Sequence, residues 1–194
     1  VTRAMSDALS NYAVVLKEFN PDLLVVLGDR YETFCMAAAA TVMNIAVAHV
    51  HGGETTEGAI DEAFRHAITK MSHLHFASCE PYRRRIIQLG EAPDRVWNVG
   101  SLGVENVLSM ELAPKEEIRS FLGLAPDQPY FVSTYHPVTL EADTGLDQLG
   151  HLVSVLREHP GHVTVFTGAN ADPGGAAINS HLAELAARDT GFRF

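Results

Sequence analysis

The sequence predicts an α/β protein built from parallel sheets, and three of its features support this fold class. Short runs of aliphatic and β-branched residues recur along the chain, and longer segments with helical spacing separate them. The run at residues 22–27 is almost entirely apolar, which is typical of a strand buried on both faces. With 46% hydrophobic residues the chain can bury a core. Strands that alternate with helices in this way predict a parallel sheet with helices on both faces.

The first half of the chain is expected to begin with a helix over residues 5–19, which Asn20-Pro21 ends. Residues 34–50 contain no acid, lysine or arginine, so they resemble a membrane span at first sight. Asn44 divides them into an alanine-rich helix and a β-branched strand, which predicts a buried helix-turn-strand instead. The expected strands are residues 22–27, 45–50, 74–77 and 96–99, and the further helices are 33–43, one from about 59, 81–89 and one near 107.

A boundary between two domains is expected in the segment 113–127, which contains Pro114. This proline favours the start of a short helix that would close at Gly123, and further prolines punctuate the segment after it. We expect an N-terminal α/β domain at 1–112, a connector at 113–127 and the start of a C-terminal α/β domain at 128–194. In that second domain the expected strands are residues 130–134 and 163–166, and the expected helices are 146–158 and 176–187.

The charge and the cysteines limit the possible partners and the compartment. A net charge of −10 argues against unassisted binding to nucleic acid or to an anionic membrane. An anionic substrate would need local cations or helix N-termini, because the overall field repels it. Cys35 and Cys79 are too few for a disulfide framework, so they predict reduced thiols in a cytoplasmic protein. No signal peptide is visible, and a first residue other than Met suggests a partial chain.

Residues 49–76 contain the side chains best suited to chemistry. The segment leaves a strand, breaks at Gly52-Gly53 and then enters a helix, and a glycine pair lets backbone approach a ligand closely. Asp61 and Arg65 are four residues apart, so they share a face of that helix. Carboxylates and imidazoles next to such a loop are the usual groups for proton transfer.

Several polar loops follow predicted strands. In parallel α/β sheets, ligands bind beyond the carboxyl ends of the strands. Asp29, Glu54, His136 and the loop at 168–175 each come directly after a predicted strand. We therefore expect these residues to face one crevice.

Four motifs occur in a fixed order along the chain. They are G-D-R-Y-E at 28–32, G-G-E at 52–54 with G-A-I-D-E at 58–62, R-H-A-I-T-K at 65–70, and Y-H-P-V-T at 135–139. Together they resemble the hydrolysing UDP-N-acetylglucosamine 2-epimerases, which begin the synthesis of sialic- and legionaminic-type acids. The resemblance implies two doubly wound Rossmann-like domains in a glycosyltransferase-B-like architecture. It also implies that the chain is truncated at both ends, without the first strand and loop and without the later strands of the second domain.

The resemblance also implies a reaction. UDP-N-acetylglucosamine would lose its C2 proton and UDP in an anti elimination to 2-acetamidoglucal, and water would then add to release N-acetylmannosamine. Such chemistry needs a base near C2, a second acid or base, and cations or N–H dipoles for the diphosphate. It implies no cofactor and no metal, and a dimer or tetramer of identical chains. The sugar is left open, because a UDP-diacetamido sugar is an alternative to UDP-N-acetylglucosamine.

By the resemblance, the candidate catalytic carboxylates are Asp29, Glu54 and Asp61. His136 matches a histidine proposed to assist the departure of UDP. The plainer interpretations are a helix N-cap for Asp29, loop bracing for Glu54, a dipole partner for Asp61 and a turn residue for His136. His51 occupies a position where many relatives carry a catalytic glutamate. Either Glu54 replaces that glutamate, or His51 itself moves protons, or the protein acts on a different sugar.

Other candidates would bind substrate. Arg65 by resemblance supports the carboxylates or contacts the sugar, and its expected pairing with Asp61 is compatible with both roles. The loop at 168–175 leads into a helix, and its N–H groups are suited to phosphate or uridine. The candidate substrate-binding residues are Arg30, Gly52, Gly53, Arg65, Asn170, Asp172 and Gly174.

Three alternative functions stay open at this stage. A metal-dependent hydrolase is one, because His49 and His51 alternate on a strand and would point to one face, with Glu54 as a further ligand. A glycosyltransferase of the same architecture would bind the same nucleotide sugar without epimerising it. The third alternative is an inactive fragment that binds the UDP-sugar weakly or not at all.

Overall fold

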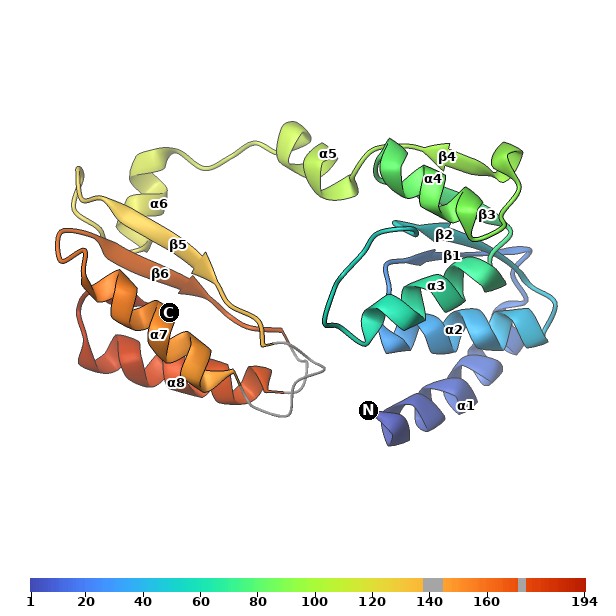
Figure 1. Cartoon of the computed structure of the whole chain (residues 1–194), viewed down its shortest axis with the longest axis horizontal. Helices are drawn as coiled ribbons and strands as arrows, with labels where there is room; N and C mark the ends of the chain where they lie inside the picture. The colour runs from blue at the N-terminus through green and yellow to red at the C-terminus, as the bar shows by residue number, and fades with distance from the viewer. Residues whose placement is uncertain (138–144, 171–173) are drawn as a thin grey trace. The chain divides into compact units, whose positions relative to one another are not determined.

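The structure of the protein is a computed structural model that describes residues 1–137, 145–170 and 174–194 (Figure 1). The chain divides into two compact units, Val1–Met110 and Glu111–Phe194. Among the described residues, no helix is long and apolar enough to cross a membrane.

The first unit alternates strands with helices (Figure 1). Every strand and helix predicted for this half is present, and only the short 3-10 helix η1 was not predicted. The strands are β1 (Leu23–Leu27), β2 (Ala46–Val50), β3 (Leu74–Ala77) and β4 (Val96–Asn98). The helices are α1 (Thr2–Phe19), α2 (Tyr31–Val42), α3 (Asp61–Met71), α4 (Glu80–Gln88), η1 (Pro93–Arg95) and α5 (Leu102–Ser109).

The four strands of this unit form one parallel sheet in the order β1-β2-β3-β4. Val26 of β1 lies opposite His49 of β2, which in turn lies opposite His75 of β3. A helix connects each strand to the next, so all four strands run in one direction and their carboxyl ends share one edge of the sheet. The loops that follow β1 to β4 therefore come together at this edge, and for the loops with Asp29 and Glu54 the sequence predicted this.

Strand β1 is a strand as predicted, but the prediction that it is buried on both faces is wrong. Val26 is buried, whereas Leu23, Val25 and Leu27 are exposed. The strand lies at the edge of the sheet, and α2 packs against it on the side of Val26. The opposite face of β1 has no covering element among the described residues, so the apolar run predicted the element but not its surroundings.

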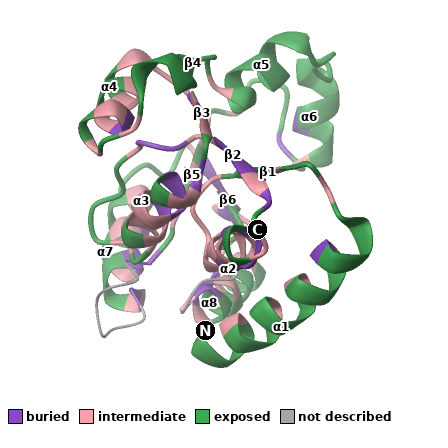
Figure 2. Cartoon of the chain, turned by 90° about the vertical axis from the view of Figure 1, so that its right-hand side faces the viewer, coloured by how far each residue is buried: buried purple, intermediate pink, exposed green. Residues whose placement is uncertain are grey.

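The core of the first unit lies between the sheet and helices α2 and α3. Val26 and Val47 contribute from the strands, and Ala37, Ala40 and Ile68 contribute from the helices. Alanines on α2 have short side chains, which lets this helix approach the sheet closely. Helix α1 packs on α2, and most of its surface is exposed (Figure 2).

The second unit contains a smaller parallel sheet in the order β5-β6-β7. Helices α7 and α8 pack on it around Leu149, Phe166 and Ile178. One feature differs from the sequence prediction, because the two-residue strand β7 is too short to show a pattern. The short helix expected after Pro114 is present within the segment 113–127. The elements are α6 (Lys115–Phe121), β5 (Tyr130–Thr134), α7 (Leu146–Arg157), β6 (Val163–Thr167), α8 (Gly175–Arg188) and β7 (Phe192–Arg193).

Candidate active site

A pocket of about 360 Å³ lies at the carboxyl edge of the first sheet. It brings together four residues that the sequence singled out, which are Asp29, His51, Glu54 and Arg65. They come from different parts of the chain, because Asp29 follows β1, His51 and Glu54 follow β2, and Arg65 belongs to α3. The other residues of the pocket wall are Leu27, Gly28, Leu102, Gly103 and Asn106.

Arg65 is the centre of a charged network in this pocket. Its side chain is only 5% exposed and forms ion pairs with Asp29 and Glu62. Nη1 lies 3.0 Å from Glu62 Oε2, while Nη2 donates to Asp29 and, at 2.9 Å, to the hydroxyl of Thr56. A planar guanidinium presents donors in a fixed fork, so it can hold several acceptors at once. Arg65 thereby links the loop after β1, the loop after β2 and helix α3.

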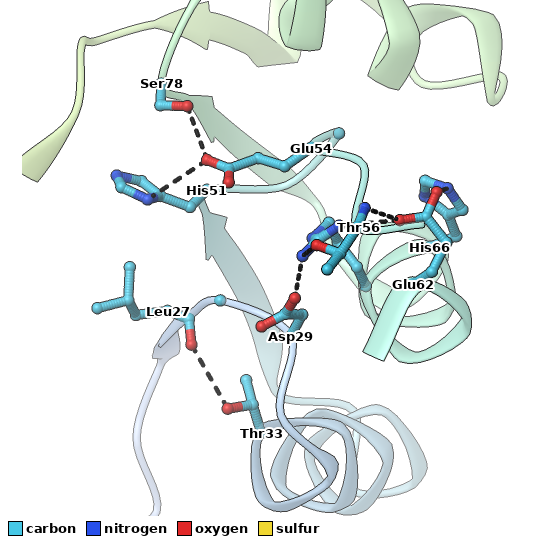
Figure 3. Close-up of polar contacts among 12 residues, drawn as sticks. Leu27, Asp29, Thr33, His51, Glu54, Thr56, Glu62, His66 and Ser78 are labelled. Atoms are coloured by element: carbon cyan, nitrogen blue, oxygen red, sulfur yellow. Dashed lines mark hydrogen bonds and ion pairs between the residues drawn. The ribbon is translucent and has the colours of Figure 1, made fainter. Parts of the chain in front are cut away.

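Glu62 holds the loop after β2 against α3 (Figure 3). Its Oε2 accepts the backbone N–H of Thr56 at 2.7 Å, and its Oε1 lies 3.1 Å from Nε2 of His66. Burial alone would raise the pKa of Glu62, but the Thr56 N–H, His66 and Arg65 outweigh burial and hold this pKa below its ordinary value. Glu62 is therefore an ionised group that shares Arg65 with Asp29.

His51, Glu54 and Ser78 form a second polar chain in the pocket (Figure 3). The backbone N–H of Leu102 donates to Nε2 of His51 at 3.3 Å, so the neutral ring carries its proton on Nδ1. Nδ1 lies 3.5 Å from Oε1 of Glu54, and that oxygen accepts the hydroxyl of Ser78 at 2.7 Å. An imidazole N–H next to a carboxylate is an arrangement suited to moving a proton.

The His49–His51 ligand pair expected for a metal-dependent hydrolase is not formed. His51 has a left-handed backbone with φ of 64°, so it lies beyond β2 and does not continue the strand's alternation. His49 is fully buried, and its two ring nitrogens contact Gly28 O at 2.8 Å and Thr69 Oγ1 at 3.3 Å. No group of three or more His, Cys, Asp or Glu residues suited to a metal ion occurs in the part of the chain that the structure describes.

Close packing explains why the two residues after His51, Gly52 and Gly53, are both glycine. Both are buried. A Cβ on Gly52 would lie 2.9 Å from Nδ1 of His49, and a Cβ on Gly53 would overlap the carbonyl oxygen of Tyr82. Gly53 also has a φ of 77°, and its carbonyl accepts the guanidinium of Arg85. Side chains at these positions would push the loop away from β2 and α4. A direct contact between these glycines and a substrate stays a prediction.

The buried His49 gives the protein a stability that depends on pH. Burial lowers its pKa from 6.5 to about 4, and the hydrogen bond to Gly28 only partly opposes this. Because the unfolded chain binds the proton more tightly, the free energy of unfolding is fully retained above about pH 6.5 and falls as the pH drops toward 4. We expect this residue to account for a loss of about 2 kcal/mol near pH 5.

Urea unfolding of the wild type and of His49→Gln, near pH 7.5 and near pH 5, measures this effect. The variant should lose less stability between the two pH values than the wild type. The pKa of His75 is also lowered by burial, but that residue is present in both proteins and cancels in the comparison. Equal losses in the two proteins would contradict the prediction.

In the second unit, His136 follows β5 and contacts the loop after β6. The backbone N–H of Asn170 donates to Nδ1 of His136 at 3.4 Å. Asn179 of α8 fixes the same loop by bonding both backbone groups of Ala169, at 2.7 and 3.1 Å. A Cβ on Gly175 would overlap the carbonyl oxygen of Asn170, so only glycine permits this close approach. Ala169 and Asn170 are thus held against the first turns of α8.

The remaining predicted residues are placed as follows. Asp61 begins α3, in the first turn where the helix dipole favours a carboxylate, as predicted. Arg30 precedes α2 and pairs with Glu32 at 3.2 Å. Gly174 is the left-handed N-cap of α8, and Asp172 lies outside the described residues. Roles in binding or catalysis for these residues and for His136, and a crevice shared by both units, stay predictions.

Sequence reasoning missed Ser78, Thr56 and the N–H of Leu102. Ser78 directly follows β3, so the rule that strand ends share one edge would have found it. Thr56 and Leu102 gave no signal, because their contacts depend on how a loop and a helix pack in three dimensions.

The pocket lies where ligands bind in parallel α/β sheets, beyond the carboxyl ends of the strands. Solved structures show that the fold is glycosyltransferase-B-like. A UDP-GlcNAc 2-epimerase from Neisseria meningitidis matches 97% of this chain with a TM-score of 0.76 and 19% identity, over 53% of its own length. The Methanocaldococcus jannaschii UDP-GlcNAc 2-epimerase matches 97% of the chain with a TM-score of 0.79 and 18% identity, also over 53% of its length.

The chain belongs to the UDP-N-acetylglucosamine 2-epimerase family, whose sequence profile matches residues 1–193. It is 43% identical to the polysialic acid biosynthesis protein P7 of Escherichia coli over 92% of the chain and 46% of that protein. It is 39% identical to the GDP/UDP-N,N'-diacetylbacillosamine 2-epimerase (hydrolyzing) of Campylobacter jejuni over 93% of the chain and 47% of that protein. The chain therefore spans about half the length of these relatives. They do not favour the glycosyltransferase alternative.

Proposed function

We propose that the protein is a hydrolysing 2-epimerase that converts UDP-N-acetylglucosamine, or a related UDP-acetamido sugar, to the free 2-epimeric sugar and UDP. The observation that carries the proposal is the pocket in which Asp29, His51, Glu54 and Arg65 meet at the carboxyl edge of a parallel sheet. Family membership supports the reaction class. The hydrolysing relative from Campylobacter jejuni supports release of UDP rather than exchange between UDP-linked sugars.

Inversion at C2 by elimination and hydration requires two proton transfers. In the first, a base removes the C2 proton, the C1–O bond to UDP breaks and a C1–C2 double bond forms. In the second, hydroxide from water bonds to C1, and a proton returns to C2 on the opposite face of the ring. One side chain cannot serve both faces of a sugar held in one position, so two separate acid–base groups are needed.

The pocket offers two such groups with different surroundings. Asp29 is a carboxylate at the pocket wall, and the buried guanidinium of Arg65 orients its side chain. Glu54 instead shares its Oε1 between the hydroxyl of Ser78 and the Nδ1 side of His51. We assign removal of the C2 proton to Asp29 and return of a proton to the pair His51–Glu54, because the Nδ1 side of His51 faces the Glu54 carboxylate and the two form one connected polar pair.

For the UDP portion, we assign binding to the loop that follows β6. Helix α8 begins directly after this loop, so its first-turn N–H groups and its dipole favour an anion. His136 is bonded to the same loop and is assigned to the departing diphosphate. Because the chain carries a net charge of −10, such local groups are needed to hold a nucleotide diphosphate.

Proton NMR of the intact protein with UDP-N-acetylglucosamine in heavy water tests the proposal. We expect free UDP together with N-acetylmannosamine that carries deuterium at C2. A parallel reaction with a UDP-diacetamido-trideoxy sugar decides between the two substrates.

Other outcomes of this experiment would count against the proposal. Conversion to a UDP-linked epimer without free UDP would indicate a non-hydrolysing epimerase. Release of UDP only in the presence of an acceptor would indicate a glycosyltransferase. Two intact sugar nucleotides with unexchanged C2 protons would show that the protein is not a 2-epimerase for either substrate.

A further inference from the structure

We propose that His49 is a positioning residue that sets the place of Asp29 in the pocket by tying the loop after β1 to α3 and to the glycine loop. This inference rests on the proposed function for the role of Asp29, but the contacts that support it do not. His49 does not line the pocket, and its side chain acts only through the segments that it contacts.

The side chain of His49 joins three segments that carry the candidate site. Its Nε2 lies 2.8 Å from the carbonyl oxygen of Gly28, the residue directly before Asp29. Its Nδ1 lies 3.3 Å from the hydroxyl of Thr69, one turn of α3 beyond Arg65. Its ring faces Gly52, where a Cβ would come within 2.9 Å of Nδ1 and 3.1 Å of Cε1. One buried ring therefore contacts the loop after β1, the loop after β2 and helix α3.

The partners of the ring define its proton state. A carbonyl oxygen can only accept, so Nε2 of His49 must donate to Gly28. The neutral ring then has its lone pair on Nδ1, which accepts the hydroxyl of Thr69. Burial lowers the pKa of His49 to about 4, so the ring is neutral near pH 7, and its two partners select this tautomer. A fixed tautomer gives the Gly28 carbonyl a donor at a constant position.

Burial in the sheet alone does not explain these contacts, as a neighbouring histidine demonstrates. His75 lies opposite His49 in the register of β2 and β3, and both side chains are almost completely buried. The Nε2 of His75, however, lies 3.3 Å from Glu91, a residue that follows α4 and does not line the pocket. His75 is thus a matched control for the removal of a buried imidazole from this sheet.

The position of Gly28 matters because the next residue in the chain, Asp29, accepts a hydrogen bond from Arg65. The Gly28 N–H also donates to Val50 O at 3.0 Å. Both backbone groups of Gly28, the N–H and the carbonyl, are therefore hydrogen-bonded and hold the loop after β1. If the donor to the Gly28 carbonyl is lost, the loop keeps only one of these two ties. A displacement of about 1 Å in a reacting group can cost on the order of 100-fold in rate.

The kinetic test compares His49→Leu, His49→Gln and His75→Leu in the intact protein. Leucine removes both ring nitrogens, whereas the amide N–H of glutamine can reach the position of Nε2. We expect His49→Leu to lower kcat roughly 100-fold with little change in KM, and His49→Gln to recover most of that loss. His75→Leu should stay within roughly threefold of the wild type per folded molecule, with folding checked by urea unfolding.

Two kinetic results would overturn the proposal. A His49→Leu protein that is as active as His75→Leu would show that His49 does not position the site. Equal losses in His49→Leu and His49→Gln would show that the donor to Gly28 is not the feature that matters.

Two further measurements do not depend on epimerase activity. Nitrogen-15 NMR of the His49 ring should show a protonated Nε2 and an unprotonated Nδ1 at neutral pH. Hydrogen exchange at the amides of residues 28–30 should become faster in His49→Leu and stay unchanged in His75→Leu. The opposite tautomer, or unchanged exchange in His49→Leu, would refute the positioning role. If the wild type acts on neither sugar nucleotide, the proposed function fails, while these two measurements still decide whether His49 holds the loop.

Discussion

Replacement of Asp29 by asparagine is expected to lower kcat/KM for UDP release by roughly 10² to 10⁴-fold, the usual contribution of a general base. Asparagine has nearly the same shape but cannot accept the C2 proton. It also leaves the guanidinium of Arg65 with only one of its two ionised partners. Deuterium incorporation at C2 should fall together with UDP release, because both depend on the same proton transfer. Proton NMR in heavy water and a coupled assay for UDP measure the two quantities.

Glu32→Gln provides the matched control for Asp29→Asn. Glu32 lies three residues further along the chain and pairs with Arg30 at a partly exposed position. The control removes one carboxylate and one ion pair from the same segment, so it should change kcat/KM by less than about twofold. Comparable losses in the two variants would mean that the negative charge of this segment, and not the base, is what the reaction needs. Normal activity in Asp29→Asn would remove Asp29 from catalysis altogether.

Replacement of Arg65 by methionine is expected to reduce both stability and activity. Removal of one partner from a buried ion pair typically costs about 3 to 5 kcal/mol. Asp29 and Glu62 are 24% and 32% exposed, so water can partly replace the lost cation. We therefore expect a loss of roughly 2 to 3 kcal/mol in the free energy of unfolding. Activity per folded molecule should fall on the order of 100-fold, since Asp29 and the Thr56 loop lose their common partner.

Two further variants serve as controls for Arg65→Met. They are Arg65→Lys and Arg119→Met. Lysine keeps the charge but lacks the planar fork, so it should recover part of the stability and little of the activity. Arg119 is another buried arginine, and it donates to the carbonyl oxygens of Ala125 and Gln128 in the second unit. Its replacement should destabilise the protein without lowering activity per folded molecule. If Arg65→Lys is fully active, the network needs only a positive charge at this point.

The sequence predicted the order of the elements well because the pattern of a strand is local. Strands β3 and β5 begin and end at the residues expected, since short apolar runs with sharp polar boundaries define them. The burial of β1 was predicted wrongly from the same kind of run. An apolar run predicts that a strand forms, but the number of buried faces of that strand depends on its position in the sheet. The short strand β7 left no pattern at all.

The sequence predicted that Asp29 and Glu54 lie together, through the rule that ligands bind beyond the carboxyl ends of strands, and the resemblance added His51 and Arg65 as candidates. The pairing within the group was not predicted. Spacing predicted Asp61 as the partner of Arg65, whereas the structure pairs Arg65 with Glu62 and with Asp29, which is 36 residues away in the sequence. Contacts of this kind depend on how a side chain is buried between segments that are distant in the sequence, and no local sequence pattern encodes that burial.

The two histidines of β2 illustrate how a single backbone angle changes an interpretation. Strict alternation would place His49 and His51 on one face. A φ of 64° at His51 ends the strand and turns that ring toward Leu102 and Glu54, while His49 stays buried. Histidine tolerates this left-handed conformation better than most residues, so the sequence is compatible with it but does not require it.

The parallel order of the strands also governs how the protein reaches this structure. Each pairing joins residues separated by a complete helix, for example Leu23 with Ala46. Such non-local contacts form slowly, because the chain loses loop entropy before the contacts repay it. The ion pair between Asp29 and Arg65 needs β1, β2 and α3 in place together. A newly synthesised chain therefore lacks its charged pocket until α3 has docked, and refolding should restore substrate turnover later than it restores helix content.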